Sequence, residues 1–437
     1  MFTHEKCKQV PQNPYSVRTL LLRSGERLPV LISLATGEPL FETVVYTLCE
    51  LRATNKASNT IDQILRSIML LQLFLDSNNI DIEARLKRGV VLSLNEIDEL
   101  VRQCRRPVAA QLKANSASHS RRPIRAATAE VIRLVQRQIV SVEVAGHTAA
   151  NRVRVIRDYL DWLVRYRLPC YQTDAVGGTW LWDEWKRCRD ALDARVPRHK
   201  GRNAIGQREG LPTEVTAHLL NVMAPDSPQN PWRSEATRIR NYLLVRWLHD
   251  LGLRRGEVLN VKISDINFQS EEVTVARRPD DPADPRRGQP KVKTRDRILP
   301  ISSNLCGLTH DYVMTIRRSI EGARRHPFLF VAGGTGAPLS LSSLNDVFAE
   351  LRRAFPGEFD RLTPHVLRHT WNDRFSETMD NAKVSESDEE RMRSFLMGWS
   401  PTSITAARYT RRHVRLKAER VSLAMQASQA EGVPHDD

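Results

Sequence analysis

The feature that most constrains this chain is a basic stretch near its middle, residues 195–210. Arginine, histidine, lysine, glycine and asparagine dominate it, and apolar residues are almost absent. Because such a stretch has too little apolar surface to join a hydrophobic core, it predicts a boundary between two folded bodies. The chain of 437 residues leaves each side long enough to bury a core of its own.

Before this boundary the sequence predicts a hairpin followed by helices. Apolar and polar residues alternate over Tyr15 to Leu22 and again over Leu28 to Leu34, as in two half-buried strands. Ser93 and Glu96 have the spacing of a helix-capping box. Two helices are indicated by apolar faces, which consist of Ile61, Ile64, Leu65, Ile68, Leu71 and Leu75, and of Val153, Ile156, Leu160 and Leu163. The second helix carries four arginines at other angles, which could face phosphates or solvent equally well: Arg152, Arg154, Arg157 and Arg165.

After the boundary, helices dominate again, with one small sheet. The apolar pattern of residues 239–251 predicts a buried helix that Gly252 can end in the left-handed conformation. Two segments, Glu272 to Ala276 and Lys291 to Ile301, predict strands joined by a loop rich in Asp, Pro and Arg. The sequence therefore predicts a mostly α protein with a small antiparallel β-sheet, of the α+β class.

The balance of charge favours a polyanionic partner. The chain has 66 Lys and Arg against 51 Asp and Glu, a formal net charge of +15, which suits DNA but also occurs in ribosomal and membrane-surface proteins. No apolar run approaches the roughly 18 residues of a membrane span. Residues 1–12 lack the apolar region of a signal peptide. We therefore expect a cytoplasmic protein without membrane contact.

The six cysteines are scattered, and no two of them form a Cys-x-x-Cys pair. This arrangement fits the reduced thiols of an intracellular protein better than a zinc site or a disulfide framework. The sequence also contains no acidic cluster typical of a metal site, so we expect no bound metal.

Two motifs place arginines where they could hold a phosphate. Arg254 lies at a helix junction, and Glu257, one helical turn later, can orient it through a charged hydrogen bond. In the second motif, Thr363-Pro364 can start a helix that places His365 and Arg368 on one face. The planar arginine fork matches two phosphate oxygens, and histidine can exchange a proton near neutral pH.

Farther along the chain, Trp399 and Tyr409 are the remaining candidates for such a site. The indole N–H of Trp399 can donate to a phosphate oxygen, and its ring can support a neighbouring side chain. Tyr409 is the last tyrosine of the chain. A tyrosine attacks phosphorus only when a neighbour takes its proton or when positive charge favours the phenolate.

Three motifs together resemble the catalytic domain of the tyrosine recombinases, the phage integrase family. They are Leu-Gly-Leu-Arg-Arg-Gly-Glu-Val-Leu, Thr-Pro-His-Val-Leu-Arg-His, and Leu-Met-Gly-Trp followed by Ala-Ala-Arg-Tyr. The resemblance implies a two-domain DNA clamp, in which a basic linker joins a helical core-binding domain to the catalytic domain. The expected divisions are a hairpin extension at 1–40, the core-binding region at 41–200, the linker at 201–210, the catalytic domain at 211–425 and a flexible tail at 426–437.

The resemblance also implies catalytic roles. Tyr409 would attack the scissile DNA phosphate and form a covalent 3′-phosphotyrosine. Arg254, Arg368 and Trp399 would hold the oxygens of that phosphate. His365 would act as the base and later as a proton donor.

In this family a lysine on the hairpin between the arginine motifs protonates the leaving 5′ oxygen. Lys291 and Lys293 alternate onto the same face of the predicted strand, and we choose Lys293 because Lys-Thr-x-x-Arg before Leu-Pro is closest to the family pattern. Lys291 is the alternative. Glu257 would support Arg254. A phosphodiester is exchanged for a phosphotyrosyl ester of similar energy, so the resemblance implies neither a cofactor nor a metal.

The expected partner is double-stranded DNA at specific recombination sites, bound by a homotetramer with or without accessory proteins. Such an enzyme would integrate or excise a mobile element, and would be associated with the nucleoid when bound to DNA. Two alternatives stay open. One is a non-catalytic DNA-binding assembly factor of a mobile element, and the other is a type IB topoisomerase that relaxes supercoils by the same chemistry.

Overall fold

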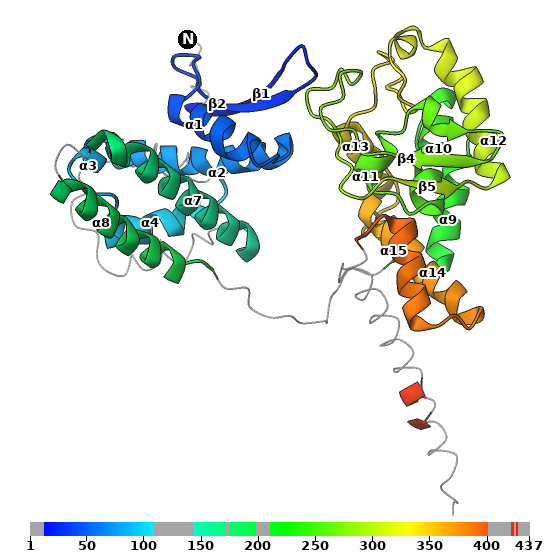
Figure 1. The fold of residues 1–437 in the computed structure, drawn as a ribbon. Coiled ribbons are helices and arrows are strands. Elements are labelled where there is room, and N and C mark those ends of the chain that lie inside the picture. Colours follow the sequence, from blue (N-terminus) through cyan, green and yellow to red (C-terminus); the bar gives the residue numbers. More distant parts are fainter. Residues whose placement is uncertain are drawn as a thin grey trace, which may run out of the picture. The chain divides into compact units, whose positions relative to one another are not determined.

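The computed structural model describes residues 13–108, 143–171, 175–197 and 210–400, together with 421–423 and 425–426. The chain divides into two compact units, one formed by almost all residues up to 203 and the other by residues from 204 onwards. Helices dominate both units, and each contains a small antiparallel sheet (Figure 1). The predicted fold class is confirmed. No helix among the described residues is both long and apolar enough to cross a membrane.

The first unit begins with a hairpin, as the alternation of apolar and polar residues predicts. Strands β1 (Tyr15–Leu21) and β2 (Arg27–Ser33) pair in antiparallel register. The inward side chains of β2 are buried against the helices that follow. These helical segments are α1 (Phe41–Tyr46), the π-helical turn η1 (Thr47–Arg52), α2 (Ser58–Ser77), α3 (Ile82–Lys87), α4 (Leu94–Cys104), α7 (Gly146–Tyr171) and α8 (Ala175–Ala194).

The core of the first unit lies among α2, α4, α7 and α8. Both predicted apolar faces point into this core, and Ile61, Leu65, Val153 and Ile156 are among its most buried residues. Trp185 of α8 is fully buried, and its indole N–H donates to Asp161 at 2.7 Å. Five cysteines among the described residues are free thiols: Cys104, Cys188 and Cys306 are buried, and Cys49 and Cys170 are exposed.

All four of the arginines singled out on α7 make contacts within the first unit, and Arg154 donates to Asn151 of its own helix at 3.3 Å. Arg152 donates to two backbone carbonyls at the end of α4. Arg157 forms an ion pair with Asp193 of α8, and Arg165 forms one with Asp161 one turn earlier. Contacts within the protein therefore explain the positions of Arg152, Arg157 and Arg165 without a bound phosphate.

The start of α4 is fixed by the capping box that the sequence predicts. The Ser93 side chain accepts the Glu96 backbone N–H, and the Glu96 carboxylate accepts the Ser93 N–H at 2.8 Å. Arg85 of α3 adds two charged hydrogen bonds to the same carboxylate, at 2.7 and 2.8 Å. The hydrogen bond from Arg85 outweighs partial burial and lowers the pKa of Glu96 to about 2.

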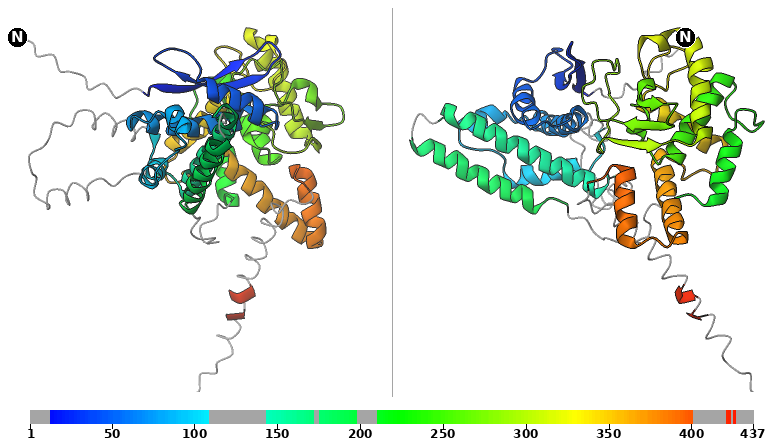
Figure 2. Two further views of the ribbon diagram at one scale, coloured as in Figure 1. Left: turned by 60° about the vertical axis from the view of Figure 1, so that its left-hand side comes forward. Right: turned by 45° about the vertical axis from the view of Figure 1, so that its right-hand side comes forward.

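The second unit places a three-stranded antiparallel sheet, in the order β3-β4-β5, among helices. Helices α14 and α15 lie side by side at one end of this unit (Figure 2). The elements are α9 (Thr213–Met223), α10 (Glu235–Asp250), α11 (Arg255–Val258), η2 (Ile263–Asp265), β3 (Ile266–Asn267), β4 (Glu272–Val275), β5 (Arg297–Pro300), α12 (Ser303–Asp311), η3 (Tyr312–Arg317), η4 (Glu321–Arg325), α13 (Leu341–Ala354), α14 (Pro364–Asn381) and α15 (Glu386–Met397).

The predicted strand Lys291 to Ile301 is wrong over its first half, because β5 begins only at Arg297. Backbone groups before this point have partners outside the sheet. The Arg295 N–H donates to the Gly398 carbonyl at 2.9 Å. The Arg277 N–H, just after β4, donates to the Asp296 side chain at 2.7 Å. In a continued sheet it would instead donate to a backbone carbonyl of the neighbouring strand. The sheet therefore ends early, and the lysine-bearing segment packs against neighbouring elements.

Replacement of Glu96 by Gln tests the pH dependence of the capping network. A carboxylate whose pKa is lowered by folding contributes stability above its ordinary pKa of about 4.3, and this contribution is lost as the pH falls toward the folded value. We expect Glu96→Gln to be less stable than wild type at neutral pH, with the difference shrinking between about pH 5 and pH 2. Urea unfolding at a series of pH values measures it.

The matched control is Glu99→Gln, because Glu99 pairs with Arg102 on the exposed face of the same helix. Exposed pairs contribute little, so this variant should stay close to wild type at every pH. A difference between Glu96→Gln and wild type that is independent of pH would contradict the lowered pKa.

Candidate active site

The first predicted arginine is held by the glutamate that follows it. Gly252 ends α10 with φ of +60°, and a Cβ there would lie 2.7 Å from the Trp371 ring, so glycine is required. Arg254 then occupies the position before α11. Its backbone N–H and its Nη1 donate to the two oxygens of Glu257 at 3.0 and 3.2 Å. The Glu257 side chain is 0% exposed and that of Arg254 is 29% exposed, so the carboxylate holds a guanidinium that can still be reached.

The second arginine reaches the same place from α14. Thr363 caps this helix and Pro364 opens it, as the sequence predicts. The Arg368 side chain is 1% exposed, and its Nη1 donates to the Gly252 carbonyl at 2.7 Å and lies 3.8 Å from a Glu257 oxygen. His365, on the same helix, is exposed. The structure thus brings Arg254, Glu257 and Arg368 together.

Glu257 is an anion in spite of its burial. Burial by itself raises the pKa of this carboxyl group, but the charges of Arg297, Arg368 and Arg254, together with the Arg254 N–H, outweigh burial and lower it. Two arginines side by side would repel each other in a medium of low dielectric constant. The shared carboxylate offsets that repulsion and lets both remain in the site.

Trp399 joins the cluster where α15 ends. Gly398 stops this helix in the left-handed conformation, with φ of +64°. Trp399 is 8% exposed, and its ring centroid lies 5.4 Å from the Arg368 guanidinium carbon, within cation–π range. The tryptophan predicted to contact phosphate therefore supports the second arginine.

The two candidate lysines have different surroundings. The loop before them is anchored by Arg286, which pairs with Asp284 at 2.8 Å and donates to the carbonyls of Leu259 and Leu339. Lys291 packs its backbone against Gly256, where a Cβ would lie 2.2 Å from the Lys291 carbonyl oxygen, and its ammonium group is buried. Lys293 is exposed and lines a hollow that it shares with Trp399. Both lysines adjoin the arginine cluster, so the choice between them stays a prediction.

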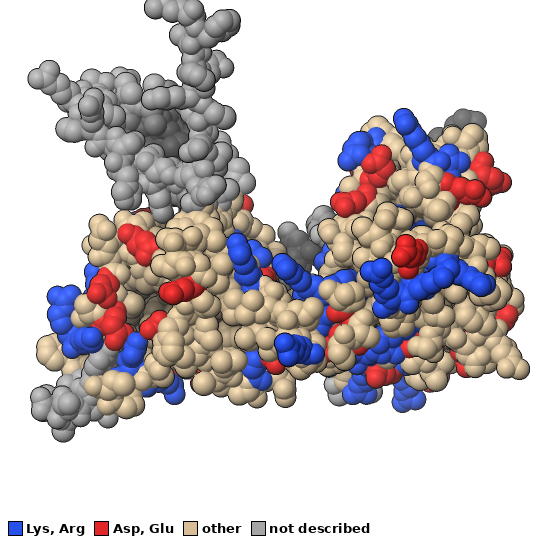
Figure 3. All heavy atoms as spheres, turned by 90° about the horizontal axis from the view of Figure 1, so that it is seen from above, with Lys and Arg blue, Asp and Glu red and all other residues tan. Residues whose placement is uncertain are grey.

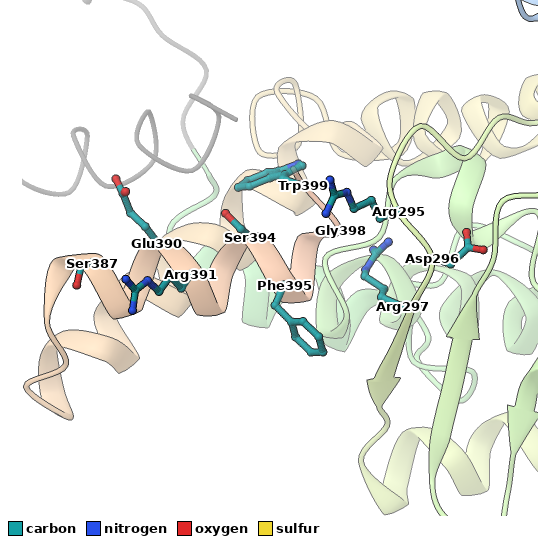
Figure 4. A pocket seen from close by; sticks show the side chains of 10 residues that line it. All are labelled: Arg295, Asp296, Arg297, Ser387, Glu390, Arg391, Ser394, Phe395, Gly398 and Trp399. Atoms are coloured by element: carbon teal, nitrogen blue, oxygen red, sulfur yellow. The ribbon is translucent and has the colours of Figure 1, made fainter. Parts of the chain in front are cut away.

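A second hollow, of about 480 Å³, adjoins the first and shares Arg295, Asp296, Gly398 and Trp399 with it. Side chains of α15 and of the segment 295–297 line it (Figure 4). Figure 4 shows Arg295 beside Trp399 at one end and Phe395 pointing away from them. The charges of its lining are mixed, since Asp296 and Glu390 lie among the arginines.

One residue of the cluster was missed by the sequence analysis. Arg297 of β5 donates to Glu257, Thr294 and the Leu396 carbonyl. A signal was available in the sequence, because Arg297 lies two residues before the apolar Leu299 and so shares the inward face of its strand. An arginine at such a position requires a buried acidic partner.

Tyr409 lies outside the described residues, so its place in the site stays a prediction. Among the described residues, no group of three or more His, Cys, Asp or Glu side chains is arranged to hold a metal ion.

Comparison with known proteins gives the family. Residues 218–415 match the model of the phage integrase family. The tyrosine recombinase XerA of Pyrococcus furiosus is 29% identical over 215 residues, which cover 49% of this chain and 63% of that protein, just under two thirds of its length. Transposase A from transposon Tn554 of Staphylococcus aureus is 24% identical over 346 residues, or 78% of this chain and 81% of that protein.

Among solved structures, the Tn1549 transposon integrase in complex with a circular intermediate DNA is 16% identical, with a TM-score of 0.41 over 80% of this chain and 99% of that one. The family match covers the two arginine motifs, Trp399 and Tyr409. Residues 218–415 therefore form a domain of the phage integrase family, the tyrosine recombinases.

Replacement of Gly398 by Ala tests how tightly the end of α15 fits the cluster. A Cβ at this position would lie 2.8 Å from Arg297 Nη1 and 2.9 Å from the Arg295 carbonyl oxygen, and φ is +64°. The conformation costs about 1 kcal/mol and the close contacts add roughly 1–3 kcal/mol to the loss of unfolding free energy. Urea unfolding measures the sum.

Gly357→Ala separates these two effects. Gly357 also has a positive φ, of +85°, but a Cβ there would meet nothing within 4 Å. This control should lose only the conformational part. Equal losses for the two variants would mean that the end of α15 is loosely packed.

Proposed function

We propose that this protein cuts and rejoins DNA at specific sites through a covalent 3′-phosphotyrosine, as a site-specific recombinase. The observation that carries the proposal is the pair Arg254 and Arg368, held on one buried carboxylate next to Trp399. Phosphoryl transfer needs positive charge fixed in advance around the reacting phosphorus more than it needs covalent chemistry from the protein. This cluster supplies such charge from side chains alone.

The proposed reaction is a balanced exchange of esters. The Tyr409 oxygen attacks phosphorus, the bond from phosphorus to the 5′ oxygen breaks, and a 3′-phosphotyrosine forms. His365 takes the phenolic proton, and a lysine, Lys293 by preference, gives a proton to the departing 5′ oxygen. Attack by a 5′ hydroxyl on the phosphotyrosine reverses these steps. Because the two esters are similar in energy, rejoining needs no external energy source.

The proposed substrate is double-stranded DNA at the ends of a mobile element. The net charge of +15 supports this proposal. So does the alignment with transposase A of transposon Tn554, which covers most of both chains. On the face of the second unit shown in Figure 3, basic side chains gather in a band interrupted by a few acidic ones. We propose further that the active assembly is a homotetramer on two DNA duplexes, with or without accessory proteins.

The first test is formation of a covalent adduct. Wild-type protein is incubated, without metal or ATP, with a duplex that it binds specifically and that carries a nick just 3′ of the scissile phosphate. The short 5′ hydroxyl strand then leaves, and the covalent product is trapped. We expect a denaturant-stable protein–DNA adduct in wild type and none in Tyr409→Phe, because phenylalanine lacks the attacking oxygen.

Tyr242→Phe is the matched control, since Tyr242 lies on α10 and contacts Arg246 rather than any residue of the cluster. It should form the adduct at the wild-type rate. Absence of the adduct in wild type, on DNA that is demonstrably bound, would favour a non-catalytic assembly factor instead.

A second experiment identifies the lysine that acts as the general acid. Replacing the scissile 5′ oxygen by sulfur gives a thiolate leaving group with a pKa of about 8.5, which departs without protonation. We expect Lys293→Ala to slow adduct formation about 10²- to 10⁴-fold on the oxygen substrate and to match wild type on the sulfur substrate. Lys291→Ala is tested in parallel. The same pattern in Lys291→Ala alone would transfer the role to Lys291, and its absence from both would exclude both lysines.

A further inference from the structure

Arg297 is buried almost as deeply as Arg368, and all of its guanidinium nitrogens are engaged by the protein. Its side chain is 2% exposed, and each of its three guanidinium nitrogens donates a hydrogen bond. Nη2 donates to Glu257 Oε2 at 3.0 Å, Nη1 to Thr294 Oγ1 at 3.0 Å, and Nε to the Leu396 carbonyl oxygen at 2.6 Å. Because each of its three nitrogens already donates to the protein, the Arg297 guanidinium serves the fold and not a DNA phosphate.

The partners of Arg297 lie on three separate segments that meet at the site. Glu257 belongs to α11 and holds Arg254. Thr294 is next to Lys293, and its hydroxyl donates to Glu257 at 2.8 Å. Leu396 is in the last turn of α15, two residues before Gly398. One side chain therefore joins the arginine cluster, the lysine segment and the end of α15.

The contact with α15 determines where the chain leaves that helix. The last carbonyls of a helix have no partner within it and favour a nearby cation. Here Arg297 donates a hydrogen bond to the Leu396 carbonyl, and Arg368 donates one to the Met397 carbonyl at 3.4 Å. Trp399 follows directly, and the segment that begins there contains Tyr409. Two arginines that both contact Glu257 thus hold the starting point of the segment with the proposed nucleophile.

We propose that Arg297 is a positioning residue for strand cleavage, which fixes the end of α15 against Arg254 and Arg368 without touching DNA. The proposal rests on the proposed function, since it concerns the same reaction. Lysine in place of Arg297 would keep the charge, but its single nitrogen at the end of a flexible stem cannot bridge Glu257, Thr294 and Leu396 together. The lost constraint should reduce the rate of the chemical step and leave DNA affinity unchanged.

The test compares Arg297→Lys with Arg317→Lys. Arg317 is a good structural match, because as whole residues both arginines are 6% exposed, and Arg317 donates to the carbonyls of Phe328, Ala323 and His326, none of which belongs to the site. The rate of adduct formation is measured on the nicked duplex at saturating DNA and scaled to the folded fraction, and DNA affinity is measured separately. We expect Arg297→Lys to be about 10- to 100-fold slower with affinity within about twofold of wild type. Arg317→Lys should lose stability but cleave at the wild-type rate.

The sulfur substrate distinguishes this role from assistance to the lysine. If Arg297 acts on the end of α15, the defect of Arg297→Lys persists with a 5′ thiolate leaving group. Recovery on that substrate would mean that Arg297 acts only through the lysine segment, and would overturn the proposal. So would a wild-type rate for Arg297→Lys. Failure of wild type itself to form an adduct would instead overturn the proposed function, and this inference with it.

Thr294 provides a second pair of variants if Arg297→Lys does not fold. Thr294→Val removes the hydroxyl that lies between Arg297 and Glu257, whereas Thr294→Ser keeps it. We expect slower cleavage in the valine variant, which has nearly the same shape, and recovery in the serine variant. Equal rates in both would also contradict the proposed network.

Discussion

The buried carboxylate of Glu257 is the interaction on which the second unit depends. A carboxylate removed from water is unfavourable by several kcal/mol unless its oxygens find charged partners. Arg254, Arg297 and Thr294 donate to it, and Arg368 lies within 4 Å. They lie at the start of α11, in β5, in α14 and in the segment just before β5. Four segments therefore meet around one buried charge.

Exposure and hydrogen-bond partners together give the three arginines around this carboxylate different tasks. Arg254 is 29% exposed and can be reached, whereas Arg297 is buried and donates from all three nitrogens to the protein itself. Arg368 donates to the Gly252 carbonyl after α10 and to the Met397 carbonyl at the end of α15, and the Trp399 ring packs beside it. Identical side chains thus acquire distinct roles from the solvent around them and from the number of donors already engaged.

Local patterns in the sequence predicted correctly those features that depend on contacts within one helical turn. The capping box of Ser93 and Glu96, the Thr363-Pro364 start of α14 and the contact between Arg254 and Glu257 each lie within one helical turn. The first half of the predicted strand from Lys291 was wrong, because the Arg295 N–H pairs with the Gly398 carbonyl, more than a hundred residues away. The sequence left open whether the arginines of α7 face phosphate or solvent, but Arg152 contacts the end of α4 and Arg157 contacts α8.

By itself the sequence determined the mostly helical class, the small antiparallel sheet and the residue types of the site, because periodicity, capping and motif spacing are local properties of a chain. Only the tertiary structure decided that Arg254, Arg368 and Arg297 converge on Glu257, and that Trp399 packs beside Arg368. It also separated Lys291, whose ammonium is buried, from Lys293, which is exposed. The physical reason is that burial and charge compensation are set by segments distant in sequence, which no local pattern records.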